Sequence, residues 1–155
     1  KISTSDQKQF RLAAVLARPT LTPFDELIID LGSDDDISTT TLVYSEGRTN
    51  IGRVVDVLPH TSRVRLYSSP EETYSVFIGK DHIPATAHGK GGGQYSADVP
   101  HGSSVVIGDI VTDSSIHDRV FGTVVSVVTD PANPFDTVLF APPVVLNSLR
   151  FVLVR

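Results

Sequence analysis

Histidine and aspartate side chains are the first candidates for catalysis in this sequence. His60 is the only histidine in the first half of the chain, and three aspartates could orient it: Asp56, Asp81 and Asp98. A serine hydrolase also needs a nucleophilic serine on a glycine-rich turn, where backbone N–H groups stabilise an oxyanion. No serine follows the glycines at 91–93 until Ser96, and Ser103 leads directly into an apolar strand. A double-barrel serine hydrolase stays an alternative, but the sequence predicts no catalytic residue and no enzyme.

Metal-binding and phosphate-binding motifs are also incomplete. His82 and His88 are too far apart in sequence for the i, i+2 or i, i+4 spacing that puts two imidazoles on one side of an element. Asp34–Asp36 lacks the pattern of a calcium-binding loop. Glycines flank Lys90, but the Walker ending of a phosphate loop is missing. The sequence therefore predicts no metal and no cofactor.

A basic and aromatic strip is the feature that we predict to bind a partner. Arg63, Arg65 and Tyr67 have the same parity, and strand side chains two residues apart point to one face. Arg53 could join them from a neighbouring strand. Such a strip suits a protein partner, although an ordinary solvent-exposed face explains it equally well. A glycan-binding barrel is a further alternative, but 4 Tyr and 7 Phe leave few aromatic residues once the cores are filled.

The elements that would position these side chains are short strands rich in valine and isoleucine. Ile51–Val57 and Phe121–Val127 follow one pattern, with Gly52 and Gly122 in second position. Glycine inside a strand is unfavourable by about 0.5–1 kcal/mol relative to alanine, so its repeated use indicates a bulge or a tight barrel bend. Gly32 precedes the first copy as Gly102 precedes the second, at the same spacing. The chain therefore has two similar halves.

This repeat predicts an all-β protein with two small six-stranded β-barrels in tandem. The first barrel is expected at 10–78 and the second at 79–155, and terminal strands can exchange between them. Residues 1–9 are expected to be a linker or the end of a helix. Four glycines are predicted to be structural: Gly32, Gly52, Gly108 and Gly122.

Composition narrows the possible functions. The chain has 155 residues, of which 40% are hydrophobic and 20% charged, as in globular domains. A net charge of −5 disfavours nucleic acid as a partner, because nucleic-acid binders present a basic face. The absence of cysteine excludes disulfides and thiolate metal sites. The chain begins with lysine and contains no methionine, so we expect it to be a piece of a longer protein.

Several motifs in a fixed order resemble the extracytoplasmic β-domain of the bacterial rod shape-determining MreC family. In chain order they are Leu27–Asp30 with Gly32-Ser33, Ile51–Val57, Gly89–Gly91, Gly108-Asp109 with Val111-Thr112, Gly122–Val124, and Asp130-Pro131 with Thr137-Val138. Each motif is weak by itself, but their order and spacing are fairly specific. The resemblance extends from about Arg11 to the end of the chain.

The resemblance implies a chymotrypsin-like topology without protease activity, and a scaffold role in the cell-elongation machinery that makes peptidoglycan. MreC-like proteins have a membrane helix and a coiled coil before the barrels, which implies a periplasmic domain on a membrane-anchored parent. They self-associate and contact a class B penicillin-binding transpeptidase and other cell-shape proteins. We therefore expect a homodimer or larger assembly that meets its partners through strand edges and exposed faces.

Overall fold

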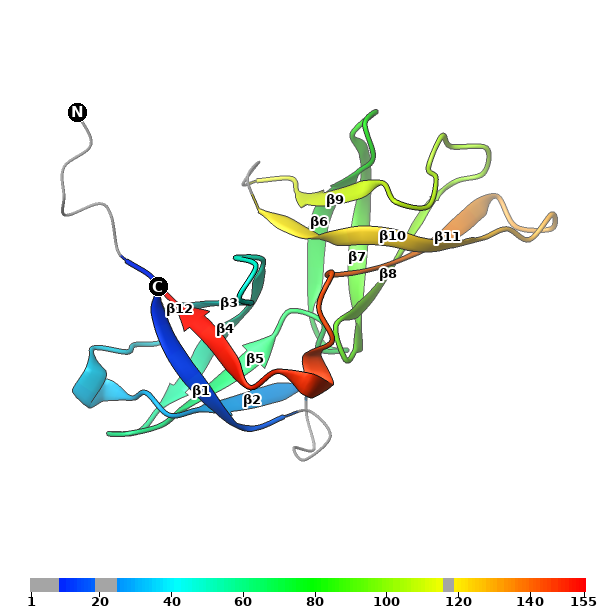
Figure 1. The fold of residues 1–155 in the computed structure, drawn as a ribbon. Coiled ribbons are helices and arrows are strands. Elements are labelled where there is room, and N and C mark those ends of the chain that lie inside the picture. The colour runs from blue at the N-terminus through cyan, green and yellow to red at the C-terminus, as the bar shows by residue number, and fades with distance from the viewer. Residues whose placement is uncertain (1–8, 19–24, 116–118) are drawn as a thin grey trace, which may run out of the picture.

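Two closed β-barrels of six antiparallel strands make up the computed structural model, which describes residues 9–18, 25–115 and 119–155 (Figure 1). The first barrel contains β1–β5 and β12: Arg11–Ala17, Glu26–Ile29, Leu42–Tyr44, Asn50–Val57, Ser62–Leu66 and Phe151–Val154. The second contains β6–β11: Thr73–Ile78, Ile83–Gly91, Gln94–Pro100, Ile110–Asp113, Val120–Val128 and Phe135–Ala141. The prediction of two six-stranded barrels is confirmed. The linker expected at 1–9 lies outside the described residues, except for Gln9.

Alternating burial along each strand explains why these segments form barrels. In β5, Val64 and Leu66 are fully buried while Arg63 is exposed, which is the period of two that a half-buried strand requires. The first core is aliphatic, whereas the second is built around rings: Tyr67, Tyr95, Phe121 and Phe140. Each buried apolar side chain stabilises the fold by about 1.5–3 kcal/mol, so the two separate clusters give each barrel its own core.

Each half of the chain gives its last strand to the other barrel. β6 pairs with β7 and β9, and β12 pairs with β1 and β3, so β12 has in the first barrel the place that β6 has in the second. The halves expected at 10–78 and 79–155 thus exchange their terminal strands, β6 and β12. β6 joins the second barrel for a local reason. It forms a hairpin with β7 that sets Ile78 opposite Ile83, and closing such a short loop costs little conformational entropy.

Gly52 and Gly122 lie where two strands approach too closely for a side chain. A Cβ on Gly52 would lie 2.5 Å from the carbonyl oxygen of Arg65, and one on Gly122 would lie 2.2 Å from that of Ala141. A β-bulge follows each glycine, between Val54 and Asp56 in the first barrel and at the corresponding place in β10. Both glycines therefore permit the tight bend that closes a barrel.

A buried carboxylate joins the two barrels. Asp25, just before β2, accepts a hydrogen bond from the Ser68 hydroxyl and another from the Gly92 N–H at 3.0 Å. The Gly93 N–H donates to Ser68 Oγ at 2.9 Å. The glycine-rich stretch is thus the turn between β7 and β8, hydrogen-bonded to the first barrel. The described residues also include two 3-10 turns, Ser33–Asp35 and Leu146–Ser148.

Candidate interaction surfaces

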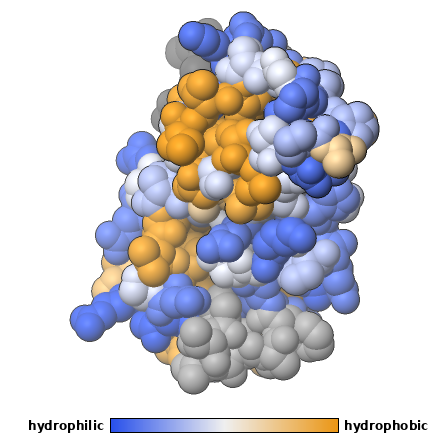
Figure 2. All heavy atoms as spheres, turned by 90° about the vertical axis from the view of Figure 1, so that its right-hand side faces the viewer, coloured by the Kyte–Doolittle hydropathy of each residue, from blue (hydrophilic) through white to orange (hydrophobic). Residues whose placement is uncertain are grey.

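Exposed apolar side chains gather on the outer face of the second barrel. They come from β9, β10, β11 and the loop before β9: Val106, Ile107, Ile110, Val125, Val128 and Phe135. We call these six residues the second-barrel patch. Figure 2 shows a broad hydrophobic area on this side of the molecule. Large contiguous apolar areas are unusual on monomeric proteins and mark sites of interaction.

Main-chain hydrogen bonds hold the second-barrel patch in shape. The Gly108 N–H donates to the Val124 carbonyl, and the Val124 N–H donates to the Asp109 carbonyl, each at 2.8 Å. The loop that carries Ile107 is therefore fixed against β10. A bulge after Val124 interrupts the strand register, and Val125 is exposed at this point. A surface that is ordered before binding loses less conformational entropy when a partner docks.

A smaller apolar surface lies on the first barrel. Leu12 and Leu16 point outward from β1, and Phe151 on the neighbouring β12 lies opposite Ala14, between them. We call Leu12, Leu16 and Phe151 the first-barrel patch. Every described strand has two neighbours in its closed barrel, so of the expected strand edges and exposed faces only the faces stay open to a partner.

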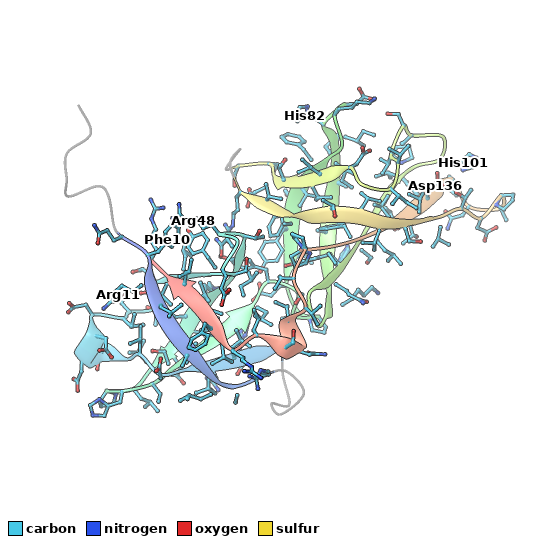
Figure 3. The ribbon with its side chains drawn as sticks, viewed as in Figure 1. Phe10, Arg11, Arg48, His82, His101 and Asp136 are labelled. Atoms are coloured by element: carbon cyan, nitrogen blue, oxygen red, sulfur yellow. The ribbon has the colours of Figure 1, made fainter. Side chains whose placement is uncertain are left out.

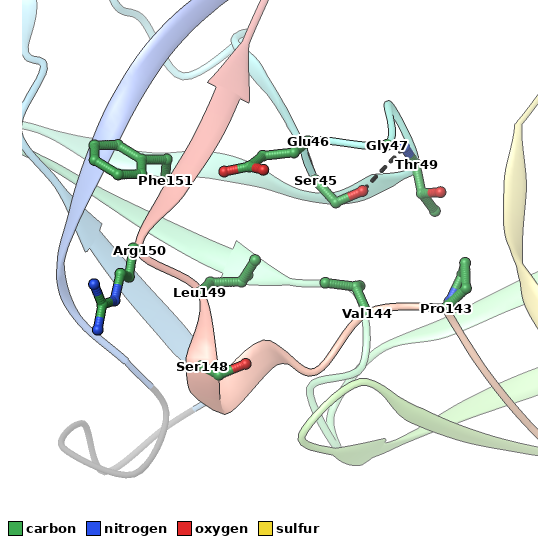
Figure 4. Close-up of a pocket in the computed structure, with 10 residues that line it drawn as sticks. All are labelled: Ser45, Glu46, Gly47, Thr49, Pro143, Val144, Ser148, Leu149, Arg150 and Phe151. Atoms are coloured by element: carbon green, nitrogen blue, oxygen red, sulfur yellow. Dashed lines mark hydrogen bonds between the residues drawn. The ribbon is translucent and has the colours of Figure 1, made fainter.

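A crevice of about 400 Å³ lies beside the first-barrel patch (Figure 4). It separates the turn between β3 and β4 from the segment that leads from β11 to β12. Thr49 is fixed there by a hydrogen bond from its N–H to Ser45 Oγ at 3.3 Å. Val144, Leu149 and Phe151 supply much of the apolar lining. The crevice has room for one or two apolar side chains of a partner.

The candidate catalytic residues do not come together in the described part of the chain. His60 is exposed and lies 3.4 Å from Asp34, which is none of the three acids considered. Each of those acids has a different partner: Asp56 binds Arg63, Asp81 accepts from Ser104, and Asp98 accepts from Thr137. No hydrogen bond joins His60 to a serine in the described residues. The geometry therefore gives the serine-hydrolase alternative no support.

A histidine–aspartate pair that sequence reasoning missed lies in the second barrel (Figure 3). His101 Nδ1 is 2.9 Å from Asp136 Oδ1, and this hydrogen bond is the main reason why the pKa of Asp136 is lowered. No serine hydroxyl in the described residues is hydrogen-bonded to the ring, so the pair lacks a nucleophile. It ties the loop after β8 to β11 and has a structural role. The two residues are 35 positions apart, and no local motif signals their contact.

The predicted basic strip is neutralised by acids. Arg63 and Arg65 lie 3.5 and 3.4 Å from the buried Glu26, and Arg53 lies 3.2 Å from Glu72. Tyr67 follows the end of β5 and is 2% exposed within the second core. The prediction that Tyr67 contacts a partner is therefore wrong, because the parity of β5 does not extend past Leu66. Glu26 on β2 and Glu72 thus offset the positive charge of the three arginines on β4 and β5.

The remaining predicted site residues are two glycines. A Cβ on Gly32 would lie 2.1 Å from the Leu58 carbonyl oxygen, whereas Gly108 has open space but a φ of +95°. Both observations agree with a backbone role. Within the described ranges, no group of three His, Cys, Asp or Glu side chains is placed to hold a metal ion. None of the described helices is long and apolar enough to cross a membrane.

Comparison with known families identifies a match along most of the chain. The family described as rod shape-determining protein MreC, barrel core, matches residues 15–155. No curated protein sequence matches the chain.

Solved structures share the fold at low sequence identity. MreC from Pseudomonas aeruginosa superposes with a TM-score of 0.80 at 23% identity, over 96% of this chain and 99% of that chain. The major periplasmic domain of the cell shape-determining filament MreC, in its orthorhombic form, gives a TM-score of 0.65 at 20% identity, over 94% and 95% of the two chains. A complex between penicillin-binding protein PBP2 and MreC from Helicobacter pylori gives 0.59 at 15% identity, over 94% and 96%.

Proposed function

Since this chain belongs to the MreC family of rod shape-determining proteins, we propose that it is a non-catalytic scaffold domain that organises peptidoglycan synthases during cell elongation. The second-barrel patch is the observation that supports this function most strongly. It is an ordered apolar surface on a domain whose described residues assemble neither a catalytic triad nor a metal site. A scaffold of this kind works by presenting surfaces to its partners.

A class B penicillin-binding transpeptidase is the proposed occupant of the second-barrel patch. The Helicobacter pylori relative was solved as a complex with the penicillin-binding protein PBP2, which supports a partner of this class. None of the six patch residues carries a charge, and the buried centre of a protein interface is depleted of charged residues. Ile107 is 71% exposed and Phe135 about half exposed, so both can serve as anchors for the partner.

Self-association is proposed for the first-barrel patch and the adjoining crevice. These two features lie on a different barrel from the second-barrel patch, so both surfaces can be occupied together. If the first-barrel patch of one copy docks on a different surface of the next, the contact is heterologous and can extend into a ring or a filament. A chain of copies that each hold one transpeptidase would distribute the synthases along the cell.

We place the domain on the periplasmic side of the cytoplasmic membrane, on a parent protein anchored by a membrane helix. The family membership and the periplasmic origin of one similar domain support this location. It also puts the second-barrel patch in the compartment where peptidoglycan is polymerised.

Site-specific photocrosslinking tests the proposed contact. A photoreactive amino acid replaces Ile107 in the parent protein, and the matched control replaces Leu58, an equally large exposed apolar residue on the first barrel. We expect a crosslink to the elongation transpeptidase from position 107 and none from position 58. Crosslinks of equal strength from both positions, or from neither, would contradict the proposal.

A further inference from the structure

Three arginines converge on one cavity in a protein that is acidic overall. The cavity has a volume of about 920 Å³ and is lined from both barrels. The first barrel contributes Phe10, Thr40, Leu42, Tyr44, residues 47–50 and Arg155, and the second contributes Arg119 and Val120. Arg48, Arg119 and Arg155 line it, and none of the described residues in the lining is an aspartate or glutamate. The whole chain has 18 acidic and 13 basic residues, so three arginines and no acid among the described lining residues reverse the overall balance of charge.

Two of these arginines pack against an aromatic ring and are not paired with a carboxylate among the described residues. The guanidinium carbons of Arg48 and Arg155 lie 5.0 and 5.1 Å from the centroid of Phe10. Figure 3 shows Phe10 and Arg48 together at the edge of the first barrel. No carboxylate lies within ion-pair distance of either arginine in the described part of the chain. Because a guanidinium beside a ring keeps its N–H groups free, both side chains can donate to an anion.

The backbone fixes both arginines at the cavity. Arg155 exchanges two main-chain hydrogen bonds with Leu42, each of 3.0 Å, as a continuation of the pairing between β12 and β3. Arg48 has a φ of +64°, which is unfavourable for a residue other than glycine. A strained backbone persists where the surrounding structure holds it, and it is often found at binding sites. The neighbouring Gly47 could adopt this φ more easily, yet the arginine occupies it.

Buried polar atoms without partners lie in the same lining. Asn50 is 7% exposed, and its Oδ1 has no hydrogen-bond partner among the described residues. Arg119 Nε is also buried and without a partner, although another nitrogen of the same guanidinium lies 3.6 Å from Asp113. A buried polar atom left unpaired costs about 1–3 kcal/mol. Both atoms lie beneath the cavity surface, so the wall there is polar and incompletely paired.

We propose that this cavity binds a phosphate-bearing molecule, with its phosphate oxygens between Arg48, Arg119 and Arg155. Guanidinium groups match the oxygens of phosphate with two parallel hydrogen bonds, and three of them favour a group with more than one negative charge. The volume is much larger than a single phosphate and falls within the range of small-molecule pockets. The rest of the ligand lies against Phe10 and Leu42. The site shares no residue with the second-barrel patch, so it is independent of transpeptidase binding.

Calorimetric titration with sodium diphosphate at about 0.15 M ionic strength tests the site, because this salt screens weak surface binding. We expect saturable binding that Arg48→Gly and Arg155→Gln each weaken about tenfold or more, through the loss of charge-assisted hydrogen bonds. Arg11→Gln is the matched control, since it removes the same charge outside the cavity, and it should bind like the unmodified chain. Glycine accepts the φ of residue 48, so Arg48→Gly should keep its melting temperature.

Two sources of phosphate are distinguished by a second arm. The chain is sedimented with vesicles of phosphatidylcholine, with or without phosphatidic acid. Binding of free diphosphate indicates a soluble phosphorylated ligand. Cosedimentation only with vesicles that contain phosphatidic acid indicates a lipid headgroup. Either result supports the site if the binding is lost in Arg48→Gly. Absence of binding in both arms overturns the proposal. So does an equal loss in Arg11→Gln, which would show a general charge effect.

Discussion

Removing the carboxylate of Asp25 should destabilise the junction between the barrels. Asp25 is 7% exposed and Ser68 is 1% exposed, so water cannot replace the lost acceptor easily. The change Asp25→Ala leaves the Ser68 hydroxyl and the Gly92 N–H without their partner. Each hydrogen bond to a charged group contributes about 1.5–3 kcal/mol, so the two together predict a loss of about 3–6 kcal/mol in the free energy of unfolding.

Urea unfolding followed by circular dichroism measures this loss. For a domain of this size, about 3–6 kcal/mol corresponds to a fall in melting temperature of roughly 6–24 °C, at 2–4 °C for each kcal/mol. Glu71→Ala is the matched control, because Glu71 is exposed in the same connecting segment and should change stability by less than about 0.5 kcal/mol.

A double-mutant cycle separates the junction from a general effect. Ser68→Ala in the Asp25→Ala background should cost much less than in the native chain, because both residues belong to one hydrogen-bonded network. An Asp25→Ala protein that loses less than about 1 kcal/mol would refute the reasoning, since a buried unsatisfied donor alone exceeds that value. Additive effects of the two substitutions would refute it as well.

Three further changes test other parts of the structure. Gly52→Val should prevent folding, because the new Cβ would lie 2.5 Å from a backbone oxygen, and soluble yield with circular dichroism measures this. Asp136→Asn should lower stability at neutral pH, and this difference should shrink as pH falls through the pKa of Asp136, which the His101 hydrogen bond lowers. Tyr67→Phe should leave the melting temperature unchanged or raise it, because the buried hydroxyl has no hydrogen-bond partner in the described residues.

Each of these changes has an outcome that contradicts its reasoning. A Gly52→Val protein with native melting temperature would show that strand approach does not require glycine there. A constant stability difference between Asp136→Asn and the native chain from pH 3 to pH 7 would exclude the charge of Asp136 as the cause. A large destabilisation by Tyr67→Phe would reveal a partner for its hydroxyl.

Local sequence patterns predict the two barrels but not which strands pair within each. The repeated glycine strands are visible in the sequence because close approach excludes a side chain at Gly52 and Gly122 wherever those strands pair. β6 and β12 each join a barrel through contacts between segments that are distant in the sequence. A short stretch of sequence does not contain the information to predict such contacts. The division expected at residue 78 allowed terminal strands to exchange, but the sequence did not show that β6 and β12 are the strands that exchange.

The interaction surfaces were harder to predict, for two physical reasons. Val125 and Ile107 have the composition of core strands, and only the folded register shows that they face outward. The parity of Arg63 and Arg65 correctly puts them on one face, but Glu26, distant in sequence, neutralises both. Charge pairing across strands is a property of the fold and not of one strand.

The affinity of this chain for the extracytoplasmic region of the elongation transpeptidase tests the central claim most directly. Isothermal titration calorimetry compares the native chain with Ile107→Asp, which places a charge in the second-barrel patch, and with Leu58→Asp as control. We predict that Ile107→Asp weakens binding by about 30-fold or more, as loss of an interface hot spot does, at unchanged melting temperature. Native affinity of Ile107→Asp, or no binding by the native chain, would contradict the account.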